Sequence, residues 1–295
     1  MFVSAIEEVG RFTRPIHTIS RNYGETIVNP GAATLFFVND EGCAVTCKHV
    51  INLIGNRKAI NDRYEKFKQE RGKIDPGNNF TQRIAALEAD FNYKTGTLVQ
   101  LKEMFVGVTT EPKFNFRWIC HPTYDLAIIQ FENFRNPRYQ SHARFLKDSS
   151  LLKQGKSLCR LGFPFAEFTN FTYNQETDDI DWTQTGQAET PRFPIDGMLT
   201  RHLVSGGEVM GIELSTPGLR GQSGGPVFDT NGIICGMQMS TNHLHLGFDM
   251  KDFEYKINGR QIKVTNQPFL HVGHCIHVDI IKRFLRENKI RFYEH

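Results

Sequence analysis

Short apolar runs, each bounded by turn-forming residues, recur along most of the chain. A run of small and apolar residues over 32–38 is followed by a turn containing Asp and Gly, and then by a second run over 43–47. Two such runs joined by a short turn predict a β-hairpin. We expect further short strands over 104–109, 116–121, 126–131, 156–162, 197–204, 208–214, 225–228, 233–239 and 270–277. The pattern therefore predicts a mostly β protein.

A charged segment over 56–101 interrupts this pattern. Ile60, Tyr64 and Phe67 recur at the spacing of apolar residues on one face of a helix. A second stretch repeats this spacing after a break rich in Pro, Gly and Asn. We therefore expect a helical hairpin inserted into a β framework.

Three other segments have their own character. The stretch over 167–196 is polar and acidic, so we expect a long loop there. Asn258-Gly259 lies between two β-prone runs and is the strongest hairpin signal in the chain. Residues 279–288 place apolar side chains on one helical face, which predicts a closing amphipathic helix.

A passage rich in Pro, Arg and Ser over 133–150 divides the chain into two halves. We expect an N-terminal unit over 1–140, which contains the helical insertion, and a C-terminal unit over 141–295. Each half holds a set of short strands with Gly-rich turns. This arrangement favours two β-barrels in tandem over a parallel α/β fold.

Composition and charge exclude several classes of protein. Hydrophobic residues make up 39% of the 295 residues and charged residues 23%, which argues against disorder. The net charge of +3 is too small to predict a nucleic-acid partner or an anionic membrane surface. No run approaches the roughly 18 apolar residues of a membrane span. We expect a soluble protein that binds neither nucleic acid nor membrane.

Two further features predict the compartment. The N-terminus carries Glu7 and Glu8 where a secretory signal needs a basic start and a long apolar run. The six cysteines are scattered through apolar segments and lack the spacing of a disulfide framework, which predicts reduced, buried thiols. We therefore expect a cytoplasmic protein.

The segment over 219–228 holds the strongest chemical signal, because Ser223 lies between glycines at 221, 224 and 225. A serine hydroxyl is a weak nucleophile that needs a base to take its proton and donors to hold the oxyanion. A glycine two residues before the serine lets the amides of both residues point into one cavity. Taken alone, the segment fits an ordinary Gly/Ser turn about equally well.

Two more segments hold the groups that such a serine needs. His49 follows the small-residue run over 43–47, and Asp125 directly precedes an apolar run. Each residue alone is better explained as an ordinary structural residue. Together, in the order His, Asp, Ser, they match an arrangement in which a carboxylate orients an imidazole and the imidazole activates the hydroxyl.

These three segments resemble the trypsin-like (chymotrypsin-fold) serine peptidases over roughly residues 32–278. The resemblance implies two tandem antiparallel six-stranded β-barrels with the active site in the cleft between them. It implies His49 as general base, Asp125 as its orienter, Ser223 as nucleophile, and the amides of Gly221 and Ser223 as the oxyanion hole. We expect a serine endopeptidase that acts on a protein or peptide through an acyl-enzyme, without a cofactor.

Finer features resemble the bacterial HtrA-like branch of these peptidases. Val50 follows the histidine where digestive enzymes carry a cysteine, and Gln222 precedes the serine where they carry an aspartate. Without that carboxylate a newly cut amino terminus has no partner, so activation by that switch is not expected. The segments over 162–164 and 272–278 resemble a second-barrel turn and the last strand of these relatives. No sequence follows the closing helix to form a PDZ domain, so we expect a peptidase domain alone.

The specificity pocket departs from the trypsin pattern. Pro217 lies six residues before the serine, where trypsin-like enzymes place the aspartate that selects Lys or Arg. The resemblance implies a pocket lined by Pro217, Arg220, Met239, Ser240, Thr241, His271 and His274. We expect a small or apolar side chain before the scissile bond. The alternative is that His271 or His274 donates to a glutamine or acidic side chain.

Three further questions stay open. His243, His245 and the histidines over 271–277 invite a metal site, but their spacing matches no recognised zinc pattern and we expect none. A catalytically silent fold that serves as a protein-binding scaffold is the competing function, given the unusual Lys48 beside His49. The insertion over 56–101 or the acidic loop over 167–196 would suit docking of a regulatory protein, although a solvated decoration is the simpler explanation of each.

Overall fold

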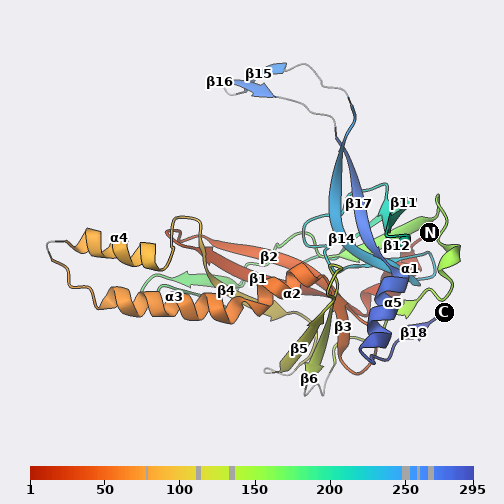
Figure 1. Cartoon of the computed structure of the whole chain (residues 1–295), viewed down its shortest axis with the longest axis horizontal. Helices are drawn as coiled ribbons and strands as arrows, with labels where there is room; N and C mark the ends of the chain where they lie inside the picture. The colour runs from red at the N-terminus through yellow and green to blue at the C-terminus, as the bar shows by residue number, and fades with distance from the viewer. Residues whose placement is uncertain (78, 111–113, 133–136, 248–252, 258–259, 265–268) are drawn as a thin grey trace.

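The computed structural model spans residues 1–295 and describes all of them except 78, 111–113, 133–136, 248–252, 258–259 and 265–268 (Figure 1). Curled antiparallel sheets dominate the described residues, so the mostly β prediction is confirmed. The helices of this part of the chain are α1 (Val3–Gly10), α2 (Lys48–Gly55), α3 (Arg57–Gly72), α4 (Phe80–Asp90) and α5 (Val278–Glu287), with a short 3-10 turn at Ser149–Leu151.

The N-terminal half forms a sheet that has six strands within the described residues, in the order β4-β1-β2-β3-β6-β5. The predicted hairpin over 32–47 is confirmed, because β2 and β3 pair with Phe36 opposite Val45. The strands expected over 116–121 and 126–131 are β5 and β6. The six strands are β1 (Thr13–Asn22), β2 (Val28–Phe37), β3 (Cys43–Thr46), β4 (Leu98–Phe105), β5 (Asn115–Cys120) and β6 (Ala127–Glu132).

The C-terminal half forms a second sheet with eight strands in the described part of the chain. Six of them pair in the order β13-β8-β11-β12-β17-β14, and β14 also pairs with β13, so that these pairings form a ring. The short β7 and β18 join in parallel beside β14, which raises the count above the expected six. The eight strands are β7 (Arg144–Phe145), β8 (Ser157–Gly162), β11 (Phe193–Ser205), β12 (Glu208–Leu214), β13 (Pro226–Phe228), β14 (Ile234–His245), β17 (Phe269–His277) and β18 (Tyr293–Glu294).

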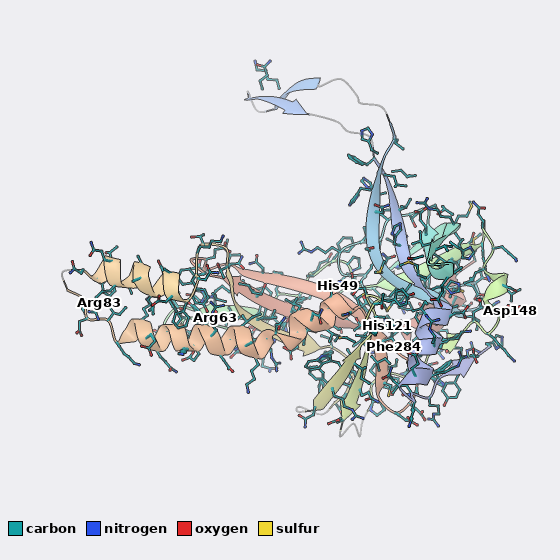
Figure 2. All side chains as sticks on the ribbon, viewed as in Figure 1. His49, Arg63, Arg83, His121, Asp148 and Phe284 are labelled. Atoms are coloured by element: carbon teal, nitrogen blue, oxygen red, sulfur yellow. The ribbon has the colours of Figure 1, made fainter. Side chains whose placement is uncertain are left out.

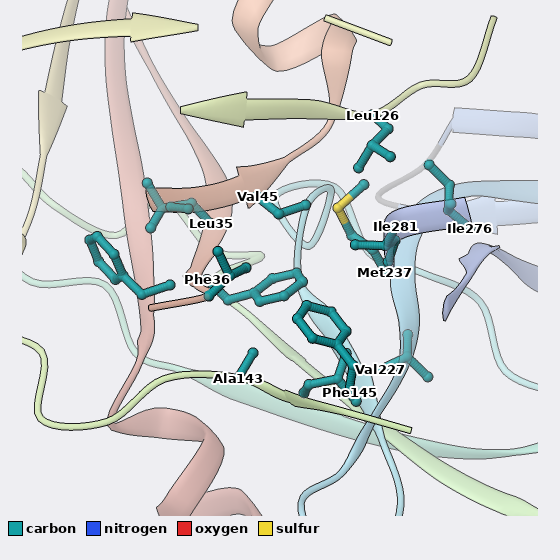
Figure 3. Packing of buried hydrophobic residues seen from close by; sticks show 14 of the residues in the cluster. Leu35, Phe36, Val45, Leu126, Ala143, Phe145, Val227, Met237, Ile276 and Ile281 are labelled. Atoms are coloured by element: carbon teal, nitrogen blue, oxygen red, sulfur yellow. The ribbon is translucent and has the colours of Figure 1, made fainter. Parts of the chain in front are cut away.

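One hydrophobic core crosses both halves. Figure 3 shows Leu35 and Val45 of the first sheet packed near Phe145 and Met237 of the second, with Ile281 of α5 beside them. The closing helix is confirmed as α5, and its apolar face is buried as the pattern predicted. Because the core is continuous, the division of the chain at residues 140 and 141 stays a prediction.

The sequence pattern missed α1 and β1. β1 lies between β2 and β4 in the first sheet, so it is a central strand. Its isoleucines at 16 and 19 are buried, but Arg14, Pro15 and His17 interrupt the apolar character, so no apolar run marks it. Pairing with β2 on one side and β4 on the other is a tertiary contact. It therefore decides the conformation of β1, because the local sequence gives no strand signal there.

Two other expectations were wrong in detail. The strand expected over 104–109 is β4, which begins at Leu98 inside the range expected to be helical, because Val99 and Leu101 are buried where β4 pairs with β1. The acidic segment over 167–196 contains the hairpin of β9 (Phe171–Asn174) and β10 (Asp179–Trp182), because Ile180 is buried against Ile19 and Phe168.

The helical insertion is confirmed, and it projects from the first sheet as the arm formed by α3 and α4 (Figure 1). The acidic hairpin is tied to helix α3 of this arm and to β1 through Asp178. Its carboxylate lies 2.8 Å from the buried guanidinium of Arg21 on β1 and accepts hydrogen bonds from Tyr64 of α3 at 2.5 Å and from Tyr173 of β9 at 2.8 Å. The two segments considered for docking thus form one connected unit, and a docking role stays a prediction.

A second projection extends from the C-terminal sheet. Strands β14 and β17 continue as a paired ribbon to His245 opposite Phe269, and the small hairpin of β15 (Phe253–Ile257) and β16 (Arg260–Val264) lies at its tip (Figure 1). The predicted hairpin residues Asn258 and Gly259 lie outside the described residues. The strands on either side of them pair as the prediction requires.

A buried histidine anchors the acidic segment to β1. His17 is fully buried, its ring stacks on Phe168 with centroids 4.0 Å apart, and its Nε2 lies 2.8 Å from the hydroxyl oxygen of Thr190. Burial lowers the pKa of His17 to about 4. The folded protein therefore holds this imidazole neutral in a pH range where the unfolded chain protonates it.

We expect the free energy of unfolding to fall as the pH drops from 6.5 to about 4. In this window the unfolded state binds one more proton at His17 than the folded state, so stability rises with pH and is lost on acidification. A pKa difference of this size contributes about 3 kcal/mol. Urea unfolding of the wild type and of His17→Phe at both ends of the window measures it, and the variant should lose that part of the pH dependence. Equal pH dependence in both proteins would contradict this account.

Candidate active site

The pairing of two strands brings His49 and Asp125 together. Thr46 at the end of β3 lies opposite Ala127 at the start of β6, so the residues just beyond these ends emerge at the same edge of the sheet. His49, in the first turn of α2, has its Nδ1 2.7 Å from Asp125 Oδ2. The backbone amide of His49 donates to Asp125 Oδ1 at 2.8 Å. The carboxylate thus holds both the ring and the backbone of the histidine.

These contacts decide the charge of Asp125 and the tautomer of His49. Burial alone would raise the pKa of Asp125, but the hydrogen bonds from the side chain and backbone of His49 outweigh burial and hold this pKa below its usual value. An ionised carboxylate can only accept, so Nδ1 of His49 carries the proton. In the neutral imidazole Nε2 is then the acceptor, which is the role that a general base requires.

The lysine beside the histidine has a structural partner. The ammonium of Lys48 donates to the backbone carbonyl of His121 at 2.8 Å and to that of Pro122 at 3.2 Å. The ring of His121 in turn accepts from the amides of Thr123 and Tyr124. Lys48 therefore ties the start of α2 to the loop that carries the carboxylate, and Figure 2 shows His49 and His121 near each other at this end of the sheet.

Backbone contacts hold Ser223 against the first sheet. Its carbonyl accepts from the amide of Thr34 on β2 at 3.0 Å, and the next amide, of Gly224, donates to the carbonyl of Gln238 on β14 at 3.0 Å. A Cβ at Gly224 would collide with the carbonyl of Thr34 and the hydroxyl of Thr46, three residues before His49. The serine turn is thus packed against the end of β3 that leads into α2.

The Ser223 hydroxyl itself points to another acceptor. Its Oγ donates to the carbonyl of Met239 at 3.4 Å. Among the described residues, no hydrogen bond joins it to His49. The structure therefore brings the histidine and the aspartate into direct contact and packs the serine turn beside them.

The turn before the serine presents two unused donors. Gly221 has φ of +101°, a conformation that favours glycine, and a Cβ there would lie 2.5 Å from the carbonyl oxygen of Phe163. Within the described part of the chain, the amides of Gly221 and Ser223 have no hydrogen-bond acceptor. These are the two groups predicted for the oxyanion hole.

Gln222 has a role that sequence reasoning missed. Its fully buried side chain accepts from the amide of Leu219 at 3.0 Å and donates to the carbonyl of Phe193 at 3.0 Å. It thereby braces the serine turn against β11 with two neutral hydrogen bonds. The polar residue in place of an aspartate was visible in the sequence, but its partners were not.

Comparison with known families agrees with this geometry. A family model described as a trypsin-like peptidase domain matches residues 33–237, well over half of the chain. The chain belongs to the trypsin-like peptidase family. The matched range contains His49, Asp125 and Ser223, and it ends inside β14. No curated protein matches the chain. No helix in the described residues combines the length and apolar character needed to span a bilayer.

This trypsin-like peptidase domain has a cleft of about 430 Å³ next to Ser223. Its walls come from the turn before the serine and from β14 and β17. Six of the seven residues expected to bind substrate line it, together with Ser223 and four other residues. The lining residues are Pro217, Gly218, Leu219, Arg220, Ser223, Gln238, Met239, Ser240, Thr241, His243 and His271.

The seventh expected residue, His274, does not line the cleft. Its Nε2 lies 3.3 Å from the buried carboxylate of Glu213 on β12, which Arg201 also contacts at 2.6 Å. The resemblance placed His274 in the pocket with His271, but the two residues are three apart along β17, and side chains that alternate along a strand then lie on opposite faces.

Three of the histidines considered for a metal site, His243, His271 and His274, have protein partners instead. His243 and His271 face each other across β14 and β17 with their Nδ1 atoms 2.5 Å apart.

Elsewhere in the described chain, the side chains of Cys47, His49 and Asp125 converge within 4.8 Å. Burial raises the pKa of the Cys47 thiol well above its usual value, and the thiol donates to the carbonyl of Gln238 at 3.4 Å. Cys47 therefore stays a protonated thiol, and it lies beside the hydrogen-bonded pair of His49 and Asp125.

Proposed function

We propose that this member of the family is a serine endopeptidase that uses Ser223, His49 and Asp125. The observation that carries the proposal is the hydrogen-bonded pair of His49 and Asp125 beside a turn whose amides at 221 and 223 are unpaired in the described structure. A base oriented by an ionised carboxylate, a serine turn packed beside it and two free amide donors are the components that acyl transfer requires.

The reaction follows from these positions. Oγ of Ser223 bonds to the carbonyl carbon of the peptide while its proton passes to Nε2 of His49, and the amides of residues 221 and 223 bind the resulting oxyanion. His49 then gives the proton to the leaving amine as the C–N bond breaks, which leaves an acyl ester on Ser223. A water molecule, deprotonated by His49, attacks this ester and releases the carboxylic acid and the free serine.

The first step requires the serine hydroxyl to change its partner. In the free protein it donates weakly to the carbonyl of Met239 at 3.4 Å. Rotation about the Cα–Cβ bond moves Oγ without moving the turn, and catalytic hydrogen bonds are often long in free enzymes and tighten when substrate binds. The proposal therefore assigns the Ser223–His49 hydrogen bond to the substrate complex.

The finer resemblance belongs to the same proposal. We infer two β-barrels with the active site between them, and a kinship with the bacterial HtrA-like branch. All six cysteines are free, and Val50 is buried in the core where digestive enzymes have a bridged cysteine. The neutral brace formed by Gln222 supports a serine turn that does not depend on a newly cut amino terminus.

Labelling with a fluorophosphonate tests the proposal against the scaffold alternative. Only an activated serine reacts, so we expect the folded protein to take up one equivalent of probe on the peptide that contains Ser223. Heat-denatured protein and the Ser223→Ala variant, which lack the assembled site or the nucleophile, should stay unlabelled. Folded wild-type protein that fails to react would favour a catalytically silent scaffold.

A further inference from the structure

The described side chains that line the cleft beside Ser223 carry positive charge and no negative charge. No Asp or Glu occurs among its described lining residues, while Arg220 lies at its exposed rim. The guanidinium of Arg220 has no hydrogen bond or ion pair to any described residue, and it directly precedes the turn that carries the nucleophile. The cleft therefore offers an unused cation within reach of a bound side chain.

A second cation lies behind the wall of the cleft. Arg160 on β8 is fully buried, and its guanidinium donates to the side-chain oxygen of Gln238 and to the carbonyl of Thr216, each at 2.6 Å. Gln238 lines the cleft, and Thr216 directly precedes the lining residue Pro217. In the described part of the molecule no carboxylate forms an ion pair with Arg160. A buried charge without a counter-ion is costly, and an anion on the other side of this wall would reduce that cost.

Arg160 also orients the amide of Gln238. A guanidinium can only donate, so the oxygen of Gln238 must face Arg160 and the nitrogen must face away from it. This nitrogen donates one hydrogen to the carbonyl of Ser240 at 2.8 Å. Its second hydrogen finds no acceptor among the described residues. The wall of the cleft therefore holds a fixed N–H donor, which suits a ligand that accepts hydrogen bonds.

The histidine pair adds a donor of the same kind. His243 and His271 both line the cleft, and their Nδ1 atoms share one hydrogen bond. The ring that accepts this bond carries its own proton on Nε2, so the pair has at least one N–H that is not used within it. Glu213 on β12, the acid that His274 contacts, is also bound by Arg201, and among the described residues no ion pair joins it to His243 or His271.

We propose that this cleft binds the carboxylate of a glutamate or aspartate side chain, so that the peptidase cleaves after acidic residues. The inference rests on the proposed function and names its substrate class. It departs from the small or apolar side chain expected from Pro217 and favours the acidic side chain that was the alternative in the sequence analysis, because the fold places Arg220 and the buried Arg160 at the cleft.

Four peptides that differ only in the residue before the scissile bond, as Glu, Gln, Ala or Lys, test the proposal. A hydrogen bond to a charged group is worth more than one to its neutral analogue, so kcat/KM for Glu should exceed that for Gln by about 10-fold or more. Lys should be the poorest substrate. A wild-type enzyme that cleaves after Gln, Ala or Lys as well as after Glu would overturn the proposal.

Variants of Arg220, the exposed residue at the rim of the cleft, test whether it causes the preference for Glu over Gln. Arg220→Gln should reduce the Glu-to-Gln ratio by about 10-fold, and Arg220→Glu should shift the preference toward Lys. Arg83→Gln is the matched control, because Arg83 is an exposed arginine on α4 of the helical arm, away from the cleft (Figure 2). Ratios that stay unchanged in both Arg220 variants would contradict the assignment.

The two proposals fail in different ways. Fluorophosphonate labelling together with cleavage that shows no acidic preference would refute the specificity and leave the peptidase function standing. A protein that neither takes the label nor cleaves any of the four peptides would refute both proposals.

Discussion

Replacing Ser223 with alanine is expected to lower turnover of a peptide ester by about 10⁴-fold or more, and replacing His49 with alanine should do the same. The serine provides the oxygen that forms the acyl ester. The histidine, oriented at 2.7 Å by Asp125, provides the base that takes the proton. Because the three groups act as a unit, the double variant should be about as slow as either single variant.

Steady-state kinetics on one activated ester measures these losses. Ser150→Ala is a suitable control, since this exposed serine lies in the short 3-10 turn outside the cleft and should retain full turnover. Far-UV circular dichroism would verify that each variant is folded. Folded Ser223→Ala protein with activity close to the wild type would refute the assignment of the nucleophile.

Replacing Gly221 with alanine should have the second largest effect, a fall in kcat of about 10²- to 10³-fold. The new Cβ would lie 2.5 Å from the carbonyl of Phe163, and φ of +101° is unfavourable for alanine. The turn must then shift, and its two amides no longer converge on one oxyanion. The Ser223 side chain and the His49–Asp125 pair stay chemically intact.

Gly96→Ala is the matched control for this variant. Gly96 also has a positive φ, of +88°, but a Cβ there has open space around it and the residue lies in the turn before β4. It should lose some stability and no activity. If Gly221→Ala kept wild-type kcat while folding normally, the amides of this turn would not form the oxyanion hole.

The sequence predicted some parts of this protein well and for identifiable reasons. Strands with continuous apolar runs, such as β2 and β6, were predicted because burial on both faces leaves a local pattern. The residues His49, Asp125 and Ser223 were selected because each lies in a distinct short motif. Their order along the chain pointed to a shared chemistry before any distance was known.

Other parts could not be predicted, because their causes are not local. β1 has no apolar run and becomes a central strand only by pairing with β2 and β4. The acidic segment forms a hairpin because Ile180 finds a buried site against β1, and because Asp178 meets the buried Arg21. In both places the partner lies far away along the chain.

The amino-acid sequence alone determined the mostly β architecture, the helical arm and the residue types available for acyl transfer, because these follow from short-range periodicity and from the chemistry of single side chains. Only the tertiary structure decided which groups meet. It set His49 on Asp125, braced the serine turn with Gln222, turned His274 toward Glu213 and placed the buried Arg160 behind the cleft. These contacts depend on strand register across segments that are remote in sequence, and no local pattern encodes that register.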